Sequence, residues 1–289
     1  PYLWTRLDAA WALGEIQDKR ATEALIAAMV GDDESSGDDR WNVRNMAIVA
    51  LGKIKDKRAT QKLIMIRKRD GRHRIRLTTA WALGEIGDKQ ATETLTTDLV
   101  GKEGQPPDEA KDVRLNAAEA LGKIRDKEAT KALTMALVGK YKDSSKDVRQ
   151  HAAKALGIIG QKQAIAALCI ALAGNGMVSR DEDIIVRQRA AKALGEMPDT
   201  KATDALIMAL REDRDEVVRR NAAETLGKIR DNQATEALTL ALARDEDEDV
   251  RRNAAVALGS IGDDQAIPAL TMALVGKRRD DYKNVRRFA

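Results

Sequence analysis

Apolar and polar positions along this chain follow a pattern that repeats every 32 to 38 residues. One repeat reads VR-x-x-A-A-x-A-L-G-x-I-x-D-x-x-A-T-x-A-L, and its apolar residues recur at spacings of three and four. That spacing is typical of helices that bury one face. A period in the thirties indicates a stacked array of small units. The motif arginines are Arg6, Arg44, Arg76, Arg114, Arg149, Arg187, Arg219, Arg251 and Arg286.

Each unit is predicted to hold two short helices. The first begins near the motif arginine and runs to a Leu-Gly pair, whose glycine we expect to end or tighten the helix. A D-K-x-A-T turn follows, and its aspartate can cap the second helix. Both helices are rich in alanine and leucine, which favour helix. The glycines are Gly14, Gly52, Gly84, Gly122, Gly157, Gly195, Gly227 and Gly259.

The pattern therefore predicts an all-α fold, an αα-superhelix or α-solenoid of eight full helix pairs plus a partial ninth. We take residues 1–289 as one repeat array. Insertions rich in Gly, Asp, Ser and Pro follow units one, three and five, and we expect them to project from one edge. Because both ends of the chain fall close to a motif, we expect a fragment of a larger protein. The units span about 2–39, 40–72, 73–110, 111–145, 146–183, 184–215, 216–247, 248–282 and, in part, 283–289.

Composition argues against several classes of function. The net charge is only +4, which argues against a protein that seeks polyanions strongly. The single cysteine, Cys169, excludes a disulfide within the chain, so we predict a reducing, cytoplasmic location. No apolar run approaches the ~20 residues of a membrane span, and we expect no membrane partner.

The repeated unit resembles the HEAT-like repeats of the phycobilisome-lyase (PBS-lyase) type, which also build artificial HEAT-like scaffolds. The resemblance covers the whole chain. It implies a right-handed superhelix whose second helices line the concave side. It also implies several functions: bilin-lyase subunits, sensor domains of signalling ATPases and plain scaffolds. Two residues depart from the pattern: Gln161 replaces a turn aspartate, and Arg67 replaces the last core leucine of unit two, which would distort the end of that unit.

One side of the second helices is unexpectedly apolar. The position thirteen residues past each glycine lies on the solvent side of a helical wheel, yet six of its eight residues are apolar and larger than alanine. Together with the alanines that flank them, these apolar residues predict a groove that an apolar helix or peptide could enter. Methionine side chains adapt to varied partners. The alternative is that tight curvature buries this position. We call these residues the apolar stripe: Met65, Met135, Ile170, Met208, Leu240 and Met272.

The tryptophans cluster near the start of the chain. Trp11, Val49 and Trp81 occupy one solvent position of three successive first helices, and Trp4 shares a face with Trp11. We expect these four residues, the N-terminal patch, to dock a missing domain or another subunit. The alternative is a set of partly exposed residues in a capping region.

Charged residues also recur with the repeat. We interpret the motif arginines and the turn aspartates as an interior ladder of charge-assisted hydrogen bonds between units, with an anion track as the alternative. A basic segment runs from Arg67 to Arg76, and a second basic cluster runs from Lys277 to Arg287. Without accompanying aromatics they are solvated loops or, alternatively, phosphate contacts. The possible phosphate contacts are Arg67, Lys68, Arg69, Arg72 and Arg74; the turn aspartates are Asp18, Asp56, Asp88, Asp126, Asp199, Asp231 and Asp263.

Catalysis has little support in the sequence. The two histidines, His73 and His151, form no His-Glu pair, and Cys169 falls on a buried arc. No spacing of metal ligands and no phosphate-cradling glycine loop occurs. We therefore predict no catalytic residue, metal or cofactor, and no enzymatic activity of this chain alone.

The sequence thus favours a protein–protein interaction scaffold or sensor domain that binds a protein or peptide along the concave second-helix face. Two alternatives stay open. One is nucleic-acid or phosphate binding through the basic loops, and the other is a bilin-lyase-like subunit.

Overall fold

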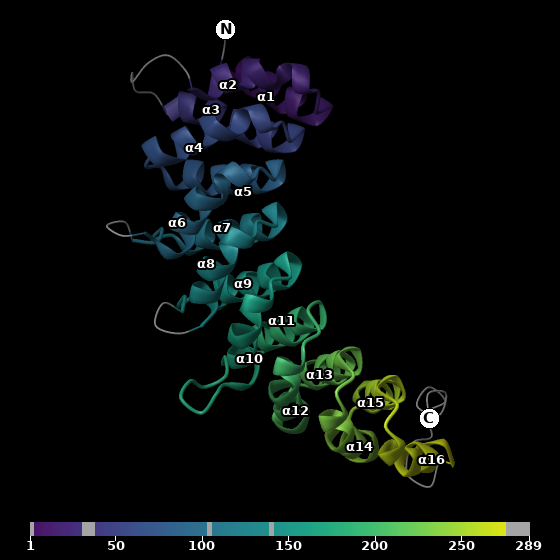
Figure 1. The fold of residues 1–289 in the computed structure, drawn as a ribbon. Coiled ribbons are helices and arrows are strands. Elements are labelled where there is room, and N and C mark those ends of the chain that lie inside the picture. The colour runs from purple at the N-terminus through teal and green to yellow at the C-terminus, as the bar shows by residue number, and fades with distance from the viewer. Residues whose placement is uncertain (1–2, 31–37, 103–105, 139–141, 276–289) are drawn as a thin grey trace. The chain divides into compact units, whose positions relative to one another are not determined.

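The computed structural model describes residues 3–30, 38–102, 106–138 and 142–275. Within these ranges the elements are sixteen α-helices and eight short 3-10 helices, and no strand occurs. The helices form the eight predicted pairs (Figure 1). The predicted partial ninth unit and the basic cluster from Lys277 to Arg287 lie outside the described residues. The α-helices are α1 (Leu3–Ile16), α2 (Thr22–Val30), α3 (Asp38–Ile54), α4 (Thr60–Arg69), α5 (His73–Ile86), α6 (Thr92–Val100), α7 (Lys111–Ile124), α8 (Thr130–Leu137), α9 (Lys146–Ile159), α10 (Ile165–Ala173), α11 (Ile184–Gly195), α12 (Thr203–Glu212), α13 (Glu216–Ile229), α14 (Thr235–Arg244), α15 (Glu248–Ile261) and α16 (Ile267–Val275).

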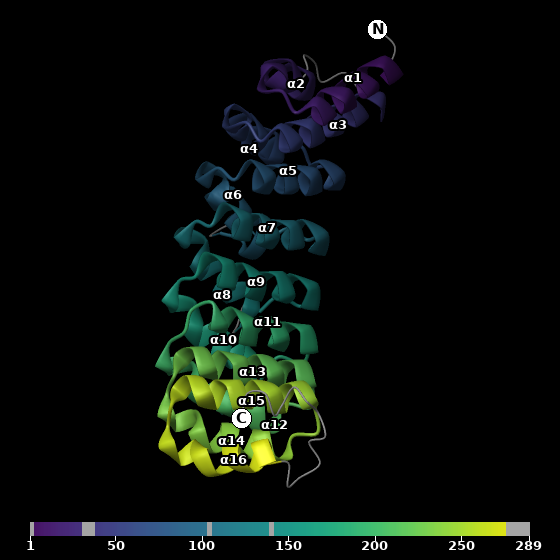
Figure 2. The same cartoon turned by 90° about the vertical axis from the view of Figure 1, so that its right-hand side faces the viewer.

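The chain divides into two compact units, one of residues 1–136 with 143–155 and the other of residues 137–142 with 156–289. In the first, the helices α1, α3, α5 and α7 pack one on the next. In the second, α11, α13 and α15 form one layer, and α10, α12, α14 and α16 form the other (Figure 2). Each unit is therefore a two-layer α-solenoid.

The predicted helix faces are buried. In α7 the valine, alanine and leucine of the motif, Val113, Ala117 and Leu121, are fully buried. In α14 the alanine and leucine positions are buried in the same way, as Ala237 and Leu238 show. Because these side chains are small, neighbouring helices can approach closely, and the core consists mainly of alanine and leucine.

Seven of the eight motif glycines lie inside the first helices and do not end them, so the prediction of a helix end was wrong for these repeats; Gly195 is the last residue of α11. Gly84 lies inside α5, which continues to Ile86 and ends at Gly87, a residue with φ of 70°. A Cβ on Gly84 would lie 2.6 Å from the Cβ of Ala120 and 2.7 Å from its Cα. The glycine is thus required where the first helices of consecutive repeats cross, because any side chain would push them apart.

A short 3-10 helix joins the two helices of each pair, and the turn aspartate begins it. The carboxylate of Asp231 accepts the backbone N–H of Gln233 at 3.1 Å. Gln161 stands at the same position of the fifth repeat and makes no such side-chain cap. The predicted capping role of the aspartates is confirmed for this short helix, which precedes the second helix. None of the described helices is long and apolar enough to cross a membrane.

Candidate functional site

The apolar stripe is more exposed in the second compact unit than in the first. Met65 and Met135 are half-buried, as is Ile170. Met208, Leu240 and Met272 are 44%, 40% and 49% exposed on α12, α14 and α16. These three side chains occupy one position of successive parallel helices, so their exposed parts follow one another along the same layer.

Two hollows adjoin Leu240. One, of about 480 Å³, lies between α12 and α14 and is lined by Leu210, Ala237 and Ala241 among others. The second, of about 450 Å³, lies between α14 and α16, where Ala269 and Met272 line it. Leu240 and Arg244 border both hollows. Alanines line both hollows beside Leu240, and charged side chains near the carboxyl ends of α12 and α14 also line the first. The role of the stripe as a binding groove stays a prediction.

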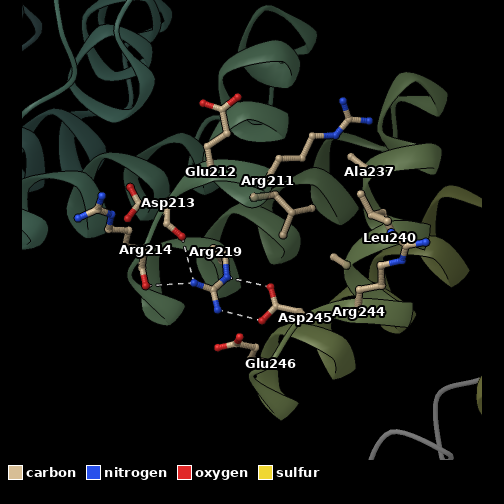
Figure 3. Close-up of a pocket in the computed structure, with 12 residues that line it drawn as sticks. Arg211, Glu212, Asp213, Arg214, Arg219, Ala237, Leu240, Arg244, Asp245 and Glu246 are labelled. Atoms are coloured by element: carbon tan, nitrogen blue, oxygen red, sulfur yellow. Dashed lines mark hydrogen bonds and ion pairs between the residues drawn. The ribbon is translucent and has the colours of Figure 1, made fainter. Parts of the chain in front are cut away.

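Arginines flank this surface at the carboxyl ends of the helices. Figure 3 shows Arg211 and Arg244 beside Leu240, whereas Glu212 and Glu246 extend away from it. Arg211 contacts Glu236 at 3.5 Å, in a pair whose glutamate is 90% exposed. Exposed ion pairs of this kind contribute little free energy, so both arginines can meet a new anionic group at small cost.

Only part of the N-terminal patch is exposed to solvent. Trp4 and Trp11 are 74% and 54% exposed on α1. Val49 and Trp81 are half-buried, and the Trp81 ring lies over Gly52, where a Cβ would come within 2.6 Å of it. The exposed part of the patch is therefore a pair of tryptophans on one helix face, and its docking role stays a prediction.

The members of the basic segment differ in exposure. Arg67 is half-buried, donates to Asp108 at 2.9 Å and forms a two-bond ion pair with Asp98. A phosphate contact from Arg67 would have to break these bonds. Arg74 lies over the Trp41 ring, 5.8 Å from its centroid, and remains exposed. Phosphate binding by the exposed members stays a prediction; these are Lys68, Arg69, Arg72 and Arg74.

Arg67 and Asp98 replace an apolar pair of the repeat. Later units have leucine at the position of Arg67, as in Leu210, and alanine at the position of Asp98, as in Ala209. The helix α4 nevertheless continues through Arg67 to Arg69, so the distortion that we expected there does not occur. The physical reason is that Asp98 and Asp108 satisfy the guanidinium of Arg67, whose side chain is 11% exposed.

Burial raises the pKa of Asp98 from 3.8 to about 6. The Arg67 guanidinium opposes this rise, and the nearby carboxylate of Asp108 adds to it. Asp108 itself accepts from Arg76 at 2.7 Å, and its pKa lies below the usual range because Arg76, the backbone N–H of Ala110 and Arg67 outweigh its burial. The four side chains form a closed charge cluster inside the first compact unit.

The motif arginines do form an interior ladder, but not with the turn aspartates. Arg219 donates through Nε to Asp245 of the next repeat at 2.8 Å and through Nη1 to the backbone carbonyl of Asp213 at 3.0 Å. Arg187 binds Asp213 in the same way, at 2.6 Å. Each partner aspartate lies six residues before the next motif arginine. The same pairing joins Arg44 to Asp70, Arg76 to Asp108 and Arg114 to Asp143.

The turn aspartates form a second ladder. The Thr203 hydroxyl donates to Asp231 of the next repeat at 2.9 Å, and Thr235 donates to Asp263 at 2.7 Å. The interpretation as a structural ladder is thus correct, whereas the pairing was wrong. The sequence contained the signal, because an aspartate precedes each motif arginine after the first by six residues.

Comparisons with known proteins agree with this geometry. A family model of HEAT repeats matches six overlapping stretches that together span nearly the whole chain: residues 3–80, 37–103, 66–139, 106–176, 176–243 and 210–289. The chain belongs to the HEAT-repeat family. No curated protein sequence matches this HEAT array significantly.

Two solved structures share this fold, and a third is a weaker match. An engineered protein is 21% identical over 99% of this chain and 84% of its own, with a TM-score of 0.60. The Escherichia coli protein YibA is 20% identical over 92% of this chain and 90% of its own, with a TM-score of 0.56. The complex of CpcE and CpcF of phycocyanin lyase from Nostoc is 23% identical over 87% of this chain and 92% of its matched chain, with a TM-score of 0.46.

The single cysteine and the two histidines have the surroundings of structural residues. Burial raises the pKa of the Cys169 thiol to about 11, which leaves it protonated and poorly nucleophilic. His73 pairs with Asp112 at 2.8 Å on the surface, and His151 contacts the backbone carbonyl of Asp147. In the described part of the chain, no group of three or more His, Cys, Asp or Glu residues could hold a metal ion.

Proposed function

We propose that this HEAT array is a protein-interaction scaffold that binds a protein or peptide partner along the apolar stripe of α12, α14 and α16. One observation carries the proposal. Three large apolar side chains, Met208, Leu240 and Met272, are each at least 40% exposed at the same position of successive helices.

Burial of the apolar stripe against a partner would favour association. Burial of apolar area contributes roughly 25 cal/mol per Å² to association, before the entropic costs of binding. Contiguous exposed apolar surface of this kind marks interaction sites in soluble proteins. The stripe also has depth, because the two hollows beside Leu240 can admit side chains of a partner. We propose no catalytic role for the chain by itself.

Partner capture from a lysate of the source organism tests the proposal. The bait pair is the unaltered chain and the Met208→Lys, Leu240→Lys variant. Val256→Lys is the matched control, because Val256 is 39% exposed on α15 in the other layer. We expect a protein partner that survives nuclease treatment, is lost with the double variant and is kept with the control.

Two results would contradict the proposal. Capture that persists in the double variant would remove the stripe as the binding surface. Capture that disappears with nuclease would favour the exposed basic segment near Lys68 and Arg69 instead.

A further inference from the structure

Resting on the proposed function, we propose that the surface around Leu240 receives an amphipathic helix with one acidic flank. Its apolar side chains enter the two hollows on either side of Leu240, and its carboxylates meet Arg211 and Arg244.

The spacing of the hollows fits a helix. They lie in the grooves on either side of α14, and packed helices are about 8–10 Å apart. In a helical partner, residues seven positions apart lie on one face and are separated by about 10 Å along the axis. A peptide that binds by adding a strand to a sheet edge does not fit here, because the described residues contain no strand.

The charge of the rim selects an acidic flank. Arg244 is exposed and has no ion-pair partner among the described residues. Arg211 has only its exposed pair with Glu236. The neighbouring Arg219 is unavailable, because Asp245 and two backbone carbonyls already use its donors. Two arginines therefore remain for the carboxylates of a partner.

Glu236 is the acidic side chain nearest to these arginines. It lies 3.5 Å from Arg211 and lines the hollow between α14 and α16. A carboxylate of the partner at Arg211 therefore competes with Glu236, whereas Arg244 pairs with no carboxylate of the described residues.

Three labelled peptides test this inference by fluorescence anisotropy. Each has about 18 residues, long enough for helix formation, with leucines at spacings of three and four. One flank carries Glu in the first peptide, Gln in the second and Lys in the third. The proteins compared are the unaltered chain and three variants: Arg211→Glu with Arg244→Glu, Leu240→Lys, and the charge-matched control Lys192→Glu with Lys228→Glu on the first-helix layer.

We expect the Glu peptide to bind the unaltered chain about tenfold more tightly than the Lys peptide, from two ion pairs at the rim. The Arg211→Glu, Arg244→Glu variant should reverse this order. The control variant should keep it, and Leu240→Lys should weaken all three peptides.

The failures are distinguishable. If the three peptides bind equally and Leu240→Lys abolishes binding, the acidic flank is wrong and the apolar stripe still binds partners. A preference for Glu that survives reversal of Arg211 and Arg244 would also overturn the inference. If no peptide binds and Leu240→Lys leaves partner capture unchanged, both proposals fail.

Discussion

At the residue scale, Asp98 gives the array a specific dependence on pH. The folded chain holds the Asp98 proton more tightly than the unfolded chain, because burial raises its pKa from 3.8 to about 6. The contribution of Asp98 to the free energy of unfolding is therefore greatest below pH 4. It falls as the pH rises from about 4 to 6, by up to about 3 kcal/mol.

Urea unfolding of the unaltered chain and of Asp98→Asn at pH 4, 5, 6 and 7 measures this contribution. We expect the unaltered chain to lose stability relative to the variant as the pH rises. A relative gain would show that Arg67 keeps the pKa of Asp98 low, in spite of burial.

Gln161 offers a second test at the residue scale. It begins its 3-10 helix without the side-chain cap that Asp231 provides in a later repeat. Gln161→Asp should therefore raise the free energy of unfolding by about 1 kcal/mol, the usual contribution of such a cap. The reverse change, Asp231→Gln, should lower it by more, because Thr203 also loses its acceptor. An unchanged urea midpoint for Gln161→Asp would show that the cap contributes little here.

At the scale of elements, the crossing of α5 and α7 depends on Gly84. An added methyl group would meet the backbone and Cβ of Ala120 at less than 3 Å. Gly84→Ala should thus lower the free energy of unfolding by about 1–3 kcal/mol, as overpacking does. Gly259→Ala is the control: among the described residues outside its own helix, no atom lies within 4 Å of an added Cβ, and alanine should stabilise α15 by up to about 1 kcal/mol. Equal effects of the two changes would contradict the close-packing role.

The contact between α4 and α6 supplies a double-mutant cycle. Arg67→Leu alone leaves Asp98 buried without its partner and should cost about 3–5 kcal/mol. Asp98→Ala alone should cost less, because Arg67 keeps Asp108. The double change restores the leucine and alanine of the other repeats and should be nearly neutral. Additive losses would show that the two side chains act independently.

At the scale of the whole molecule, the repeat made most of the fold predictable. The helix pairs and the buried positions of Val113, Ala117 and Leu121 followed from helical periodicity, because each unit buries the same face. The role of Gly84 did not follow, since a glycine near a helix end has the same sequence signature as a helix cap. The partner of Arg67 was also missed, because it lies on a different repeat.

The candidate site was less predictable for a physical reason. Periodicity identified Met208, Leu240 and Met272 on the solvent side, but their exposure depends on how closely successive second helices pack. The arginine pairing was missed because the turn aspartates suggested a simpler partner. The availability of Arg244 also required the structure, because sequence spacing does not show which charges are already paired.

The most direct test of the central claim is photo-crosslinking from the stripe. A photoreactive phenylalanine analogue is placed at position 240 or, as the control, at position 256 on the first-helix layer, and each protein is irradiated in a nuclease-treated lysate of the source organism. The account predicts a crosslinked protein from position 240, competed away by the acidic amphipathic peptide, and none from position 256. Crosslinking from position 256 alone, or equally from both positions, would contradict it.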